Sequence, residues 1–456
     1  MSGLLYNTRS VFGRIYSFYS RFFEKASKPT RHTLTLFAIS ILVVEGVESV
    51  RYVYRRFFST VAKKSLNTLY YILSRAKVDH SRFSEALASV ALSLVPKAFK
   101  NHPVFLCVDD TLIAKWGTEF QDVSRLFDHS AHDGKQYLNG HCFVSLMLCV
   151  PVWKDDGKFT FLSVPLGYRV WTKDCGGDTP TTKLSIAAEM IRGVAPALEK
   201  SGGVIVLCDS WYARSQMFAL TKEFGFLDII CNVRIDTVLY DMAPERTGRR
   251  GRPRTKGERL SLDDFRLGGS MVGDFYVAHR KVVTNLLKGT VLDAFVTSAK
   301  KEGGIRRLFL STVPAAGIEM FCAWYEKTPI NQTGSDSFRY LPLMAYSIRW
   351  NIEVGYYEQK TFWSLRKYMV RSRKGIETLL NVINVAYAGM KLLPFADPAF
   401  NKYRDASPQE LRATLGHQMR EQVFISGLEL QAQVDIKSML FEEWLKTNTY
   451  DDVSVA

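Results

Sequence analysis

Apolar positions along the chain follow two patterns, and the change between them comes near residue 100. From Leu4 to about Lys100, apolar residues recur at three- and four-residue spacing, with breaks at Lys28-Pro29 and near Val95-Pro96. This spacing predicts helices. Beyond Pro103 the apolar residues gather in short runs, which predict strands. The chain therefore begins with a predicted helical region and continues as a mixed region of strands and helices.

The mixed region predicts elements in the order β-β-β-α-β-α-β. This is the order of an RNase H-like core, an α/β fold in which a mixed sheet carries helices on its faces. The predicted strands are Val104–Val108, His141–Trp153, Phe159–Val170, Val204–Cys208 and Leu227–Val233, and the predicted helices are Thr182–Leu198 and Ser215–Phe224.

An insertion separates these elements from the next helical region. Between Asp236 and Ala315 the apolar runs are again short and strand-like, and a structureless loop of that length is improbable in a compact domain. A β-rich insertion subdomain is therefore predicted. A helical region runs from Leu343 to about Leu393, and Ser407-Pro-Gln-Glu410 predicts a last helix, because it combines a capping box with Pro at the first helical position.

Positive charge is concentrated in two segments. The chain has a formal net charge of +15 and a pI near 9.4, which favours a polyanionic partner. Residues 1–100 hold 16 Lys and Arg against 5 Asp and Glu, and Arg246–Arg259 holds seven against one. Aromatic and basic residues interleave in Tyr52–Phe58. A helical DNA-binding domain has this composition, but so does any basic helical bundle, and a single basic run is usually a solvated face.

Cysteine usage and hydropathy indicate a cytoplasmic protein. Seven cysteines are spread along the chain without a Cys-x-x-Cys pair, which suits structural thiols in a reducing compartment. The most apolar segment, Leu34–Val44, is far shorter than a membrane span, and Glu45 and Glu48 follow it without a small-residue cleavage site. It is predicted to be a buried helix, and no membrane partner is expected.

Four residues with different polar groups share one predicted helical face. Tyr346, Arg349, Glu353 and Lys360 stand at relative positions 0, 3, 7 and 14. On a single helix these positions fall within roughly 60° of one another. The stripe suits a metal beside a phosphate, because a carboxylate binds the cation while Arg and Lys hold phosphate oxygens. Glu358 is a rival acid, but it lies about 140° away from Glu353.

Two further acids follow apolar strands. Asp109 comes at the end of the first predicted strand and Asp209 directly after the fourth, so both are expected on neighbouring central strands. Taken alone, each is more often a capping or solvated carboxylate. Asp110 competes with Asp109, since consecutive strand residues point to opposite faces and only one can meet a shared metal. Together with Glu353, these acids suit two-metal phosphoryl transfer, which needs several converging carboxylates.

The stripe resembles the Tyr-x2-Arg-x3-Glu-x6-Lys signature of DDE transposases of bacterial insertion sequences, in particular the IS-four family. The resemblance implies that Asp109, Asp209 and Glu353 bind two Mg²⁺ or Mn²⁺ ions and catalyse DNA cleavage. It favours Asp109 because the segment is similar to the family's Asp-Gly-Thr pattern, although Asp110 stands in the place of that Gly. Arg349 and Lys360 are then expected to hold terminal phosphates.

The same resemblance implies a cut-and-paste transposase. It would bind double-stranded DNA at terminal inverted repeats, cleave there, and join the freed 3′-OH to target DNA. Tyr346 would position the strand. A homodimer on DNA is expected, because two transposon ends must meet in one complex, and the protein is expected in the bacterial cytoplasm on the nucleoid.

The basic segment of the insertion adds a second DNA-binding motif. Arg250-Gly-Arg-Pro-Arg254 resembles an AT-hook core, with Arg250, Arg252 and Arg254 flanking an extended backbone that fits a narrow minor groove. A mobile basic loop making unspecific phosphate contacts is the alternative. Related transposases carry a similar segment, and some use a Trp such as Trp324 on a flipped base, although packing is the commoner role for a Trp.

Other chemistries lack sequence support. His129 and His132 have ligand-like spacing without Cys or His partners, so a zinc site is not expected. The chain contains no P-loop, His-Glu-x-x-His or Gly-x-Ser-x-Gly motif, so no nucleotide cofactor is expected. Two alternatives to a transposase remain open: a transposase-derived DNA-binding protein without catalysis, and a metal-dependent nuclease without strand transfer.

These predictions divide the chain into five parts. They are a helical DNA-binding domain (1–100), the first part of the catalytic core (101–235), the β-rich insertion (236–340), the last part of the core with the Glu353 helix (341–395), and a C-terminal helical region (396–456).

Overall fold

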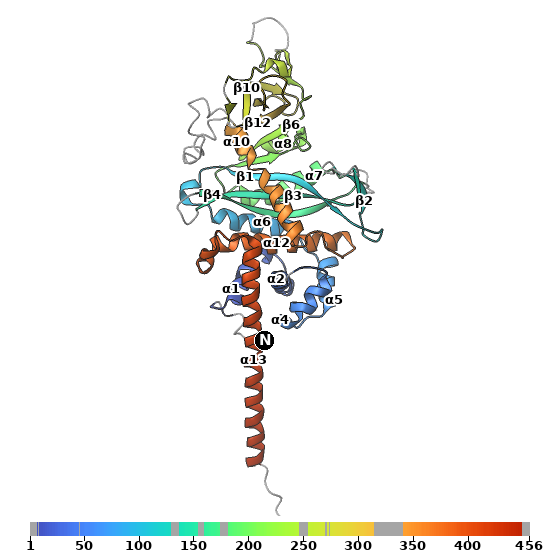
Figure 1. Ribbon diagram of the computed structural model, residues 1–456, viewed down its shortest axis with the longest axis vertical. Helices are drawn as coiled ribbons and strands as arrows, with labels where there is room; N and C mark the ends of the chain where they lie inside the picture. Colours follow the sequence, from blue (N-terminus) through green and yellow to red (C-terminus); the bar gives the residue numbers. More distant parts are fainter. Residues whose placement is uncertain are drawn as a thin grey trace, which may run out of the picture.

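One mixed sheet organises the molecule. The computed structural model describes residues 7, 9–44, 46–128, 136–153, 159–173, 181–245, 254–269, 271–272, 274–313 and 341–448. Within these residues the sheet has the strand order β2-β3-β1-β5-β6-β12-β11-β10-β7-β8, with β4 also on β3 and β9 on β10. The insertion lies above the central strands in Figure 1, helices from both ends of the chain lie below them, and helix α13 projects away from the body.

Five strands form the centre of the sheet. β1 is parallel to β5, and β5 to β6, whereas β3 runs antiparallel to β1 and β4 antiparallel to β3. The predicted order of elements is found, with a short β2 added, and the predicted mixed α/β fold is confirmed. The elements are β1 (Val104–Ala114), β2 (Ser124–Phe127), β3 (Tyr137–Trp153), β4 (Phe159–Trp171), α7 (Lys183–Leu198), β5 (Val204–Cys208), α8 (Ser215–Glu223) and β6 (Leu227–Val233).

The strands of the insertion extend the central sheet instead of forming a separate one. β12 pairs antiparallel with β6, so the ladder continues without interruption from the core into the insertion. The described elements are β7 (Leu239–Tyr240), β8 (Arg259–Leu260), η4 (Leu262–Asp264), β9 (Met271–Val272), β10 (Phe275–Thr284), β11 (Val291–Ser298) and β12 (Arg306–Ser311). The basic residues Arg250 and Arg252, together with Trp324, lie outside the described residues.

Helix α12 (Arg373–Ala396) covers the outer edge of β4 with polar side chains. The Asn381 amide accepts a hydrogen bond from the backbone N–H of Tyr168 (3.0 Å) and donates one to its carbonyl (2.9 Å). Glu377 accepts from the N–H of Val170 (2.8 Å). Gly167, directly before Tyr168, has φ of +153°, and a Cβ there would lie 2.7 Å from the Asn381 oxygen. These bonds satisfy an edge that would otherwise be open to pairing with another chain.

The first hundred residues share a core with α12 and α13. The Tyr19 hydroxyl donates to the carbonyl of Ala386 (2.7 Å), and Leu34–Val43 is buried in α2, as predicted for this apolar segment. DNA binding by this region stays a prediction. Its elements are α1 (Val11–Ser20), η1 (Arg21–Phe23), α2 (Lys28–Val43), α3 (Val50–Val53), η2 (Tyr54–Phe58), α4 (Ser59–Val61), α5 (Leu66–Ser74), α6 (His80–Ser93) and η3 (Lys97–Phe99).

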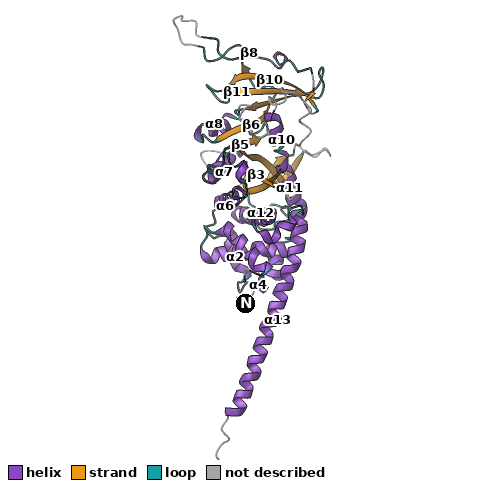
Figure 2. Ribbon diagram, turned by 90° about the vertical axis from the view of Figure 1, so that its left-hand side faces the viewer, coloured by secondary structure: helices purple, strands orange, loops and turns teal. Residues whose placement is uncertain are grey.

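The chain continues through η7 (Pro398–Tyr403) into the long helix α13 (Pro408–Asn448). Its predicted capping box is confirmed, since Ser407 and Glu410 exchange backbone-to-side-chain hydrogen bonds. From Phe424 onward nearly every described residue is exposed, including large apolar side chains, and Figure 2 shows this half extending beyond the rest of the molecule. Within the described part of the chain, α12 has the length and hydropathy of a membrane span, but most of it is buried in the core.

Candidate active site

Two neighbouring acids of strand β1, Asp109 and Asp110, point to opposite faces of the sheet. Asp109 stands opposite Ser145 of β3, whose hydroxyl is 2.6 Å from the Tyr356 hydroxyl of α11 (Trp350–Phe362). Asp110 points the other way, where its carboxylate is 2.7 Å from Lys183 Nζ of α7 and accepts from the Tyr212 hydroxyl at 3.0 Å. The alternation of strand side chains therefore gives each acid its own surroundings.

Asp209 lies beside Asp109 because their strands are parallel and in register. Val108 pairs with Cys208 in the β1–β5 ladder; Asp109 is the next residue of β1, and Asp209 directly follows β5. Asp209 Oδ1 accepts hydrogen bonds from the backbone N–H groups of Trp211 (3.0 Å) and Tyr212 (3.3 Å). The two acids thus meet where the parallel pairing of β1 with β5 ends, on the side of the sheet where open α/β sheets commonly bind ligands.

The four-residue stripe does not lie on one continuous α-helix, so the single-helix prediction is wrong in part. Helix α10 (Leu341–Ser347) ends before α11 begins, and the N–H of Arg349 bonds to Tyr346 at i−3 instead of i−4. The Tyr346 ring still lies beside Arg349, whose Cζ is 5.9 Å from the ring centroid. The Tyr346 ring packs on Phe309 of β12, with ring centroids 5.1 Å apart. Tyr346 therefore links the helix to the insertion.

Arg349 bridges the acid of β1 and the acid of α11. Its Nη1 is 2.8 Å from Asp109 Oδ2, and its Nη2 bonds to Glu353 Oε1. Glu358 instead bonds to the Tyr387 hydroxyl in the core. The guanidinium thus contacts both carboxylates. Among the described residues, no three or more His, Cys, Asp or Glu side chains are arranged so that they could hold a metal ion together.

Arg349 offsets only part of the burial of the two strand-end acids, Asp109 and Asp209, which lie where the β1–β5 ladder ends. Burial raises the pKa of Asp109 to about 7, with Arg349 opposing the shift and Asp209 adding to it. Burial also raises the pKa of Asp209, although N–H donors and Arg349 counteract it. Crowded carboxylates of this kind favour a hard cation with oxygen ligands. The donor chemistry of Asp109, Asp209 and Glu353 therefore fits Mg²⁺ or Mn²⁺.

A cavity of about 780 Å³ opens over the two strand ends. Lys360 lines it, and burial lowers the pKa of its ammonium group. The mixture of acids with several bases suits a bound phosphodiester. The charged side chains in its lining are Asp109, Asp110, Asp128, Lys173, Lys183, Asp209, Arg214, Arg234 and Lys360.

Sequence reasoning missed several residues of this cavity, and three of them form a cluster of one base and two indoles. Lys183, Trp171 and Trp211 come from α7, β4 and the turn after β5, and Lys183 Nζ lies 5.1 Å and 5.4 Å from the two indole centroids. No spacing rule connects such distant segments. The one available signal was Trp211, a large aromatic residue two positions after Asp209.

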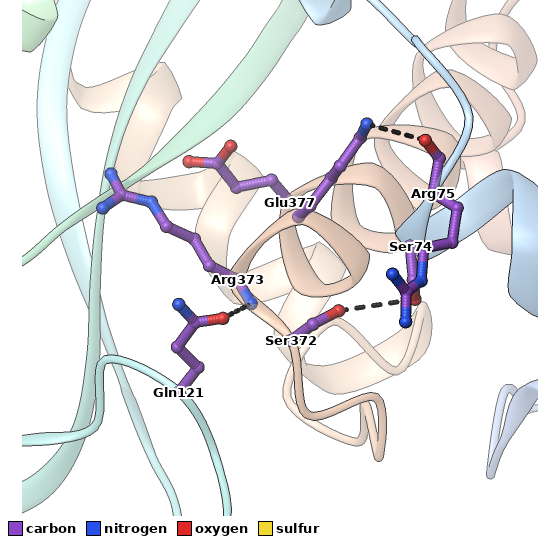
Figure 3. Close-up of a pocket in the computed structure, with 7 residues that line it drawn as sticks. Ser74, Arg75, Gln121, Ser372, Arg373 and Glu377 are labelled. Atoms are coloured by element: carbon purple, nitrogen blue, oxygen red, sulfur yellow. Dashed lines mark hydrogen bonds between the residues drawn. The ribbon is translucent and has the colours of Figure 1, made fainter.

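Other predicted site residues lie elsewhere. Arg254 is exposed and is 3.4 Å from Glu258 Oε1, so the structure does not bring it to the strand ends; Arg250 and Arg252 fall outside the described residues, as do His129 and His132. A further cavity of about 660 Å³ lies at the start of α12 (Figure 3), where Arg373 N–H bonds to Gln121 and Ser372 to Ser74. These polar groups bond to one another, and we assign the cavity no catalytic part.

Comparisons with known proteins give the family. A model of the DDE superfamily endonuclease matches residues 21–267, a range that contains Asp109 and Asp209. The sequence matches no curated protein. Among solved structures, the piggyBac transposase synaptic complex with hairpin DNA is 13% identical, with a TM-score of 0.40 and coverage of 92% of this chain and 80% of that chain. Because the family model spans more than half of the sequence, the chain belongs to the DDE superfamily endonuclease family.

Proposed function

We propose that the protein is a DDE transposase of the IS-four type, which cuts an insertion sequence out of DNA and joins it to a target. The observation that carries the proposal is the register of β1 and β5, because it sets Asp109 and Asp209 side by side beneath the helix that bears Glu353. An RNase H-like core is part of the proposal, and the parallel β1–β5–β6 arrangement with antiparallel β3 and β4 supports it.

Asp109, Asp209 and Glu353 would hold two Mg²⁺ or Mn²⁺ ions. When bound, such ions activate a water or hydroxyl nucleophile and stabilise the leaving oxygen. Arg349 neutralises Asp109 and Glu353 in the present arrangement. Once it releases them, its planar guanidinium lies where it can bind two oxygens of a DNA phosphate.

The remaining stripe residues and the basic segments would hold the DNA. Lys360 lines the cavity and would bind a phosphate, while Tyr346 would orient the strand from the junction of α10 with the insertion. The basic first hundred residues would bind the terminal inverted repeats, and Arg250, Arg252 and Arg254 would enter a minor groove.

A second candidate is a transposase-derived protein that binds DNA without cutting it. The observation that favours it is the Arg349 bridge, which keeps Asp109 and Glu353 paired with a cation of the protein itself. A protein of this kind would bind the inverted repeats and show no cleavage with Mg²⁺ or Mn²⁺.

One assay separates these functions. Labelled DNA carrying the inverted repeats that flank the gene is incubated with protein and Mg²⁺, and both nicking at the repeat end and joining to a plasmid are scored. Glu353→Gln is expected to abolish both products. Glu358→Gln is the matched control on the same helix, because its amide still accepts from Tyr387, and it should retain them.

Each outcome points to one function. Cleavage without joining would favour a nuclease, and DNA binding without any cleavage by the wild-type protein would favour the non-catalytic candidate. Cleavage that survives in Glu353→Gln would show that Glu353 has no place in the site.

A homodimer belongs to this proposal, and the far half of α13 supports it. Phe424 and Met439 are each 68% exposed, and Leu428 is 55% exposed. Exposed apolar side chains along one helix are typical of an association surface. The sedimentation coefficient should indicate a dimer for the wild-type protein and a monomer for Leu428→Glu with Met439→Glu. An unchanged dimer in that variant would exclude α13 as the interface.

A further inference from the structure

Lys183 lies close to two tryptophan rings, and all three side chains line the cavity. Its ammonium group is 5.1 Å from the Trp171 ring centroid and 5.4 Å from that of Trp211, and it pairs with Asp110 at 2.7 Å. Trp171 is fixed by a hydrogen bond from its indole N–H to the carbonyl of Thr181 (3.1 Å). Cation–π contacts favour a set orientation of both indoles relative to the ammonium.

Trp211 differs from Trp171 in its exposure. Its side chain is 52% exposed although it lines a cavity, so packing against the core does not account for its position. Its backbone is nevertheless held, because the N–H of Trp211 donates to Asp209 Oδ1 and the neighbouring Tyr212 is fully buried. The structure therefore presents a large aromatic surface to solvent from a rigid turn at the strand-end acids.

We infer that Trp211, oriented by Lys183 and Trp171, is a nucleobase-binding subsite that stacks an unpaired base of the DNA strand lying in the cavity. Aromatic surfaces beside basic side chains are the usual means of holding single-stranded nucleic acid. The cavity supplies Lys173, Arg214 and Lys360 for the backbone, and its volume of about 780 Å³ suits a small ligand such as a nucleotide.

The subsite would position the strand for the reaction proposed above, and in that respect it rests on the proposed function. Asp209 accepts the hydrogen bond that holds Trp211, so a base stacked there would keep its phosphate at a fixed distance from the strand-end acids. Lys183 is already paired with Asp110, so its proposed role is to orient the indoles. A bound base would stack on Trp211. Trp211 is thus a positioning residue.

A binding measurement without metal tests the subsite independently of cleavage. The probe is a thymidine oligonucleotide with a single 2-aminopurine at successive positions, and its fluorescence and anisotropy are followed in EDTA. Stacking on an indole quenches 2-aminopurine. The wild-type protein should quench it at one position, and Trp211→Leu should lose the quenching and bind about tenfold more weakly.

Two variants isolate the stacking contribution. Trp211→Phe keeps an aromatic face and should retain most of the affinity, whereas Trp211→Leu keeps only the apolar volume. Trp116→Ala is the matched control, because Trp116 is 91% exposed but does not line the cavity, and it should behave as wild type.

The outcomes distinguish failure of the subsite from failure of the proposed function. Equal quenching and affinity in the wild-type protein and Trp211→Leu would overturn the subsite, even if the protein cleaves repeat-end DNA. Position-specific quenching that depends on Trp211 would support the subsite, even if no metal-dependent cleavage is found.

Discussion

Two regions of this protein bury polar side chains, and they treat them in opposite ways. Along the α12–β4 edge, Asn381 and Glu377 form hydrogen bonds with backbone groups of β4. Where the β1–β5 ladder ends, Asp109 and Asp209 crowd together, and burial raises the pKa of both. The first arrangement closes an open sheet edge, while the second leaves carboxylates whose charge a cation would relieve.

The difference separates structural from functional burial of polar groups. A buried group that has its hydrogen bonds stabilises the fold, and removing one partner is costly. Crowded acids in a cavity destabilise the fold and are typical of reactive sites. Variants at the β1–β5 ends should therefore lose activity without losing stability, and variants at the α12–β4 edge should do the reverse.

The largest expected effect is on cleavage by Asp109→Asn. Loss of a charged metal ligand should lower the cleavage rate by on the order of 10³-fold. The free energy of unfolding should stay equal or rise, because burial disfavours the Asp109 carboxylate more than Arg349 favours it. Rates with labelled repeat-end DNA and urea denaturation check both parts. Asp110→Asn is the matched control, and it should cleave far faster than Asp109→Asn because Asp110 faces Lys183.

At the α12–β4 edge, Asn381→Ala should act on stability. It leaves the N–H and C=O of Tyr168 buried without partners, which costs about 3 kcal/mol of unfolding free energy. Urea denaturation measures this loss, and cleavage by the folded fraction should be unchanged. Asn67→Ala, at an exposed position of α5, is the control and should change stability by less than about 0.5 kcal/mol. Equal effects of the two variants would mean that these bonds do not stabilise the fold.

The pH dependence of stability should depend on His80 in the same helical layer. Burial lowers the pKa of His80 from 6.5 to about 4, and its Nε2 is 3.0 Å from the Thr378 hydroxyl of α12. The unfolded chain therefore takes up the proton first as the pH falls, so this contribution is complete above pH 6.5 and is lost towards pH 4. Between pH 7 and pH 5 the wild-type protein should lose about 2 kcal/mol relative to His80→Gln in urea denaturation.

At Asp109, the pH dependence of the free energy of unfolding should have the opposite sign to that at His80. The pKa of Asp109 is raised from 3.8 to about 7 in the folded state. The folded protein therefore takes up this proton first, so its contribution is complete below pH 3.8 and is lost as the pH rises through 7. Without divalent cations, the wild-type protein should gain about 2 kcal/mol relative to Asp109→Asn between pH 7 and pH 5. A parallel pH dependence of the two proteins would contradict the raised pKa that burial gives this carboxyl despite its pairing with Arg349.

The sequence predicted what depends on local pattern. The apolar runs of β1 and β5, each followed by an acid, could be predicted from the sequence because burial on both faces of a sheet gives continuous apolar stretches. The capping box at Ser407 could also be predicted, because both of its partners lie within one helical turn.

Contacts between segments far apart in the sequence could not be predicted from its local pattern. Nothing near Gly167 or Asn381 indicates that α12 covers β4, because the contact joins segments more than two hundred residues apart. The Tyr346 ring packs against Phe309 of the insertion, a contact that helical spacing alone does not indicate. For the same reason, the pairing of Lys183 with Trp171 and Trp211 had no sequence signature.

The central claim is that the Asp109 face of β1, and not the Asp110 face, binds the catalytic cation. Its most direct test exchanges the oxygen ligand for sulfur in Asp109→Cys and Asp110→Cys and compares cleavage with Mg²⁺ and Mn²⁺. Mg²⁺ requires hard oxygen ligands, and Mn²⁺ tolerates sulfur better. Asp109→Cys should be inactive with Mg²⁺ and regain cleavage with Mn²⁺, while Asp110→Cys should show the metal preference of the wild-type protein. A Mn²⁺-dependent recovery in Asp110→Cys, with none in Asp109→Cys, would contradict the assignment.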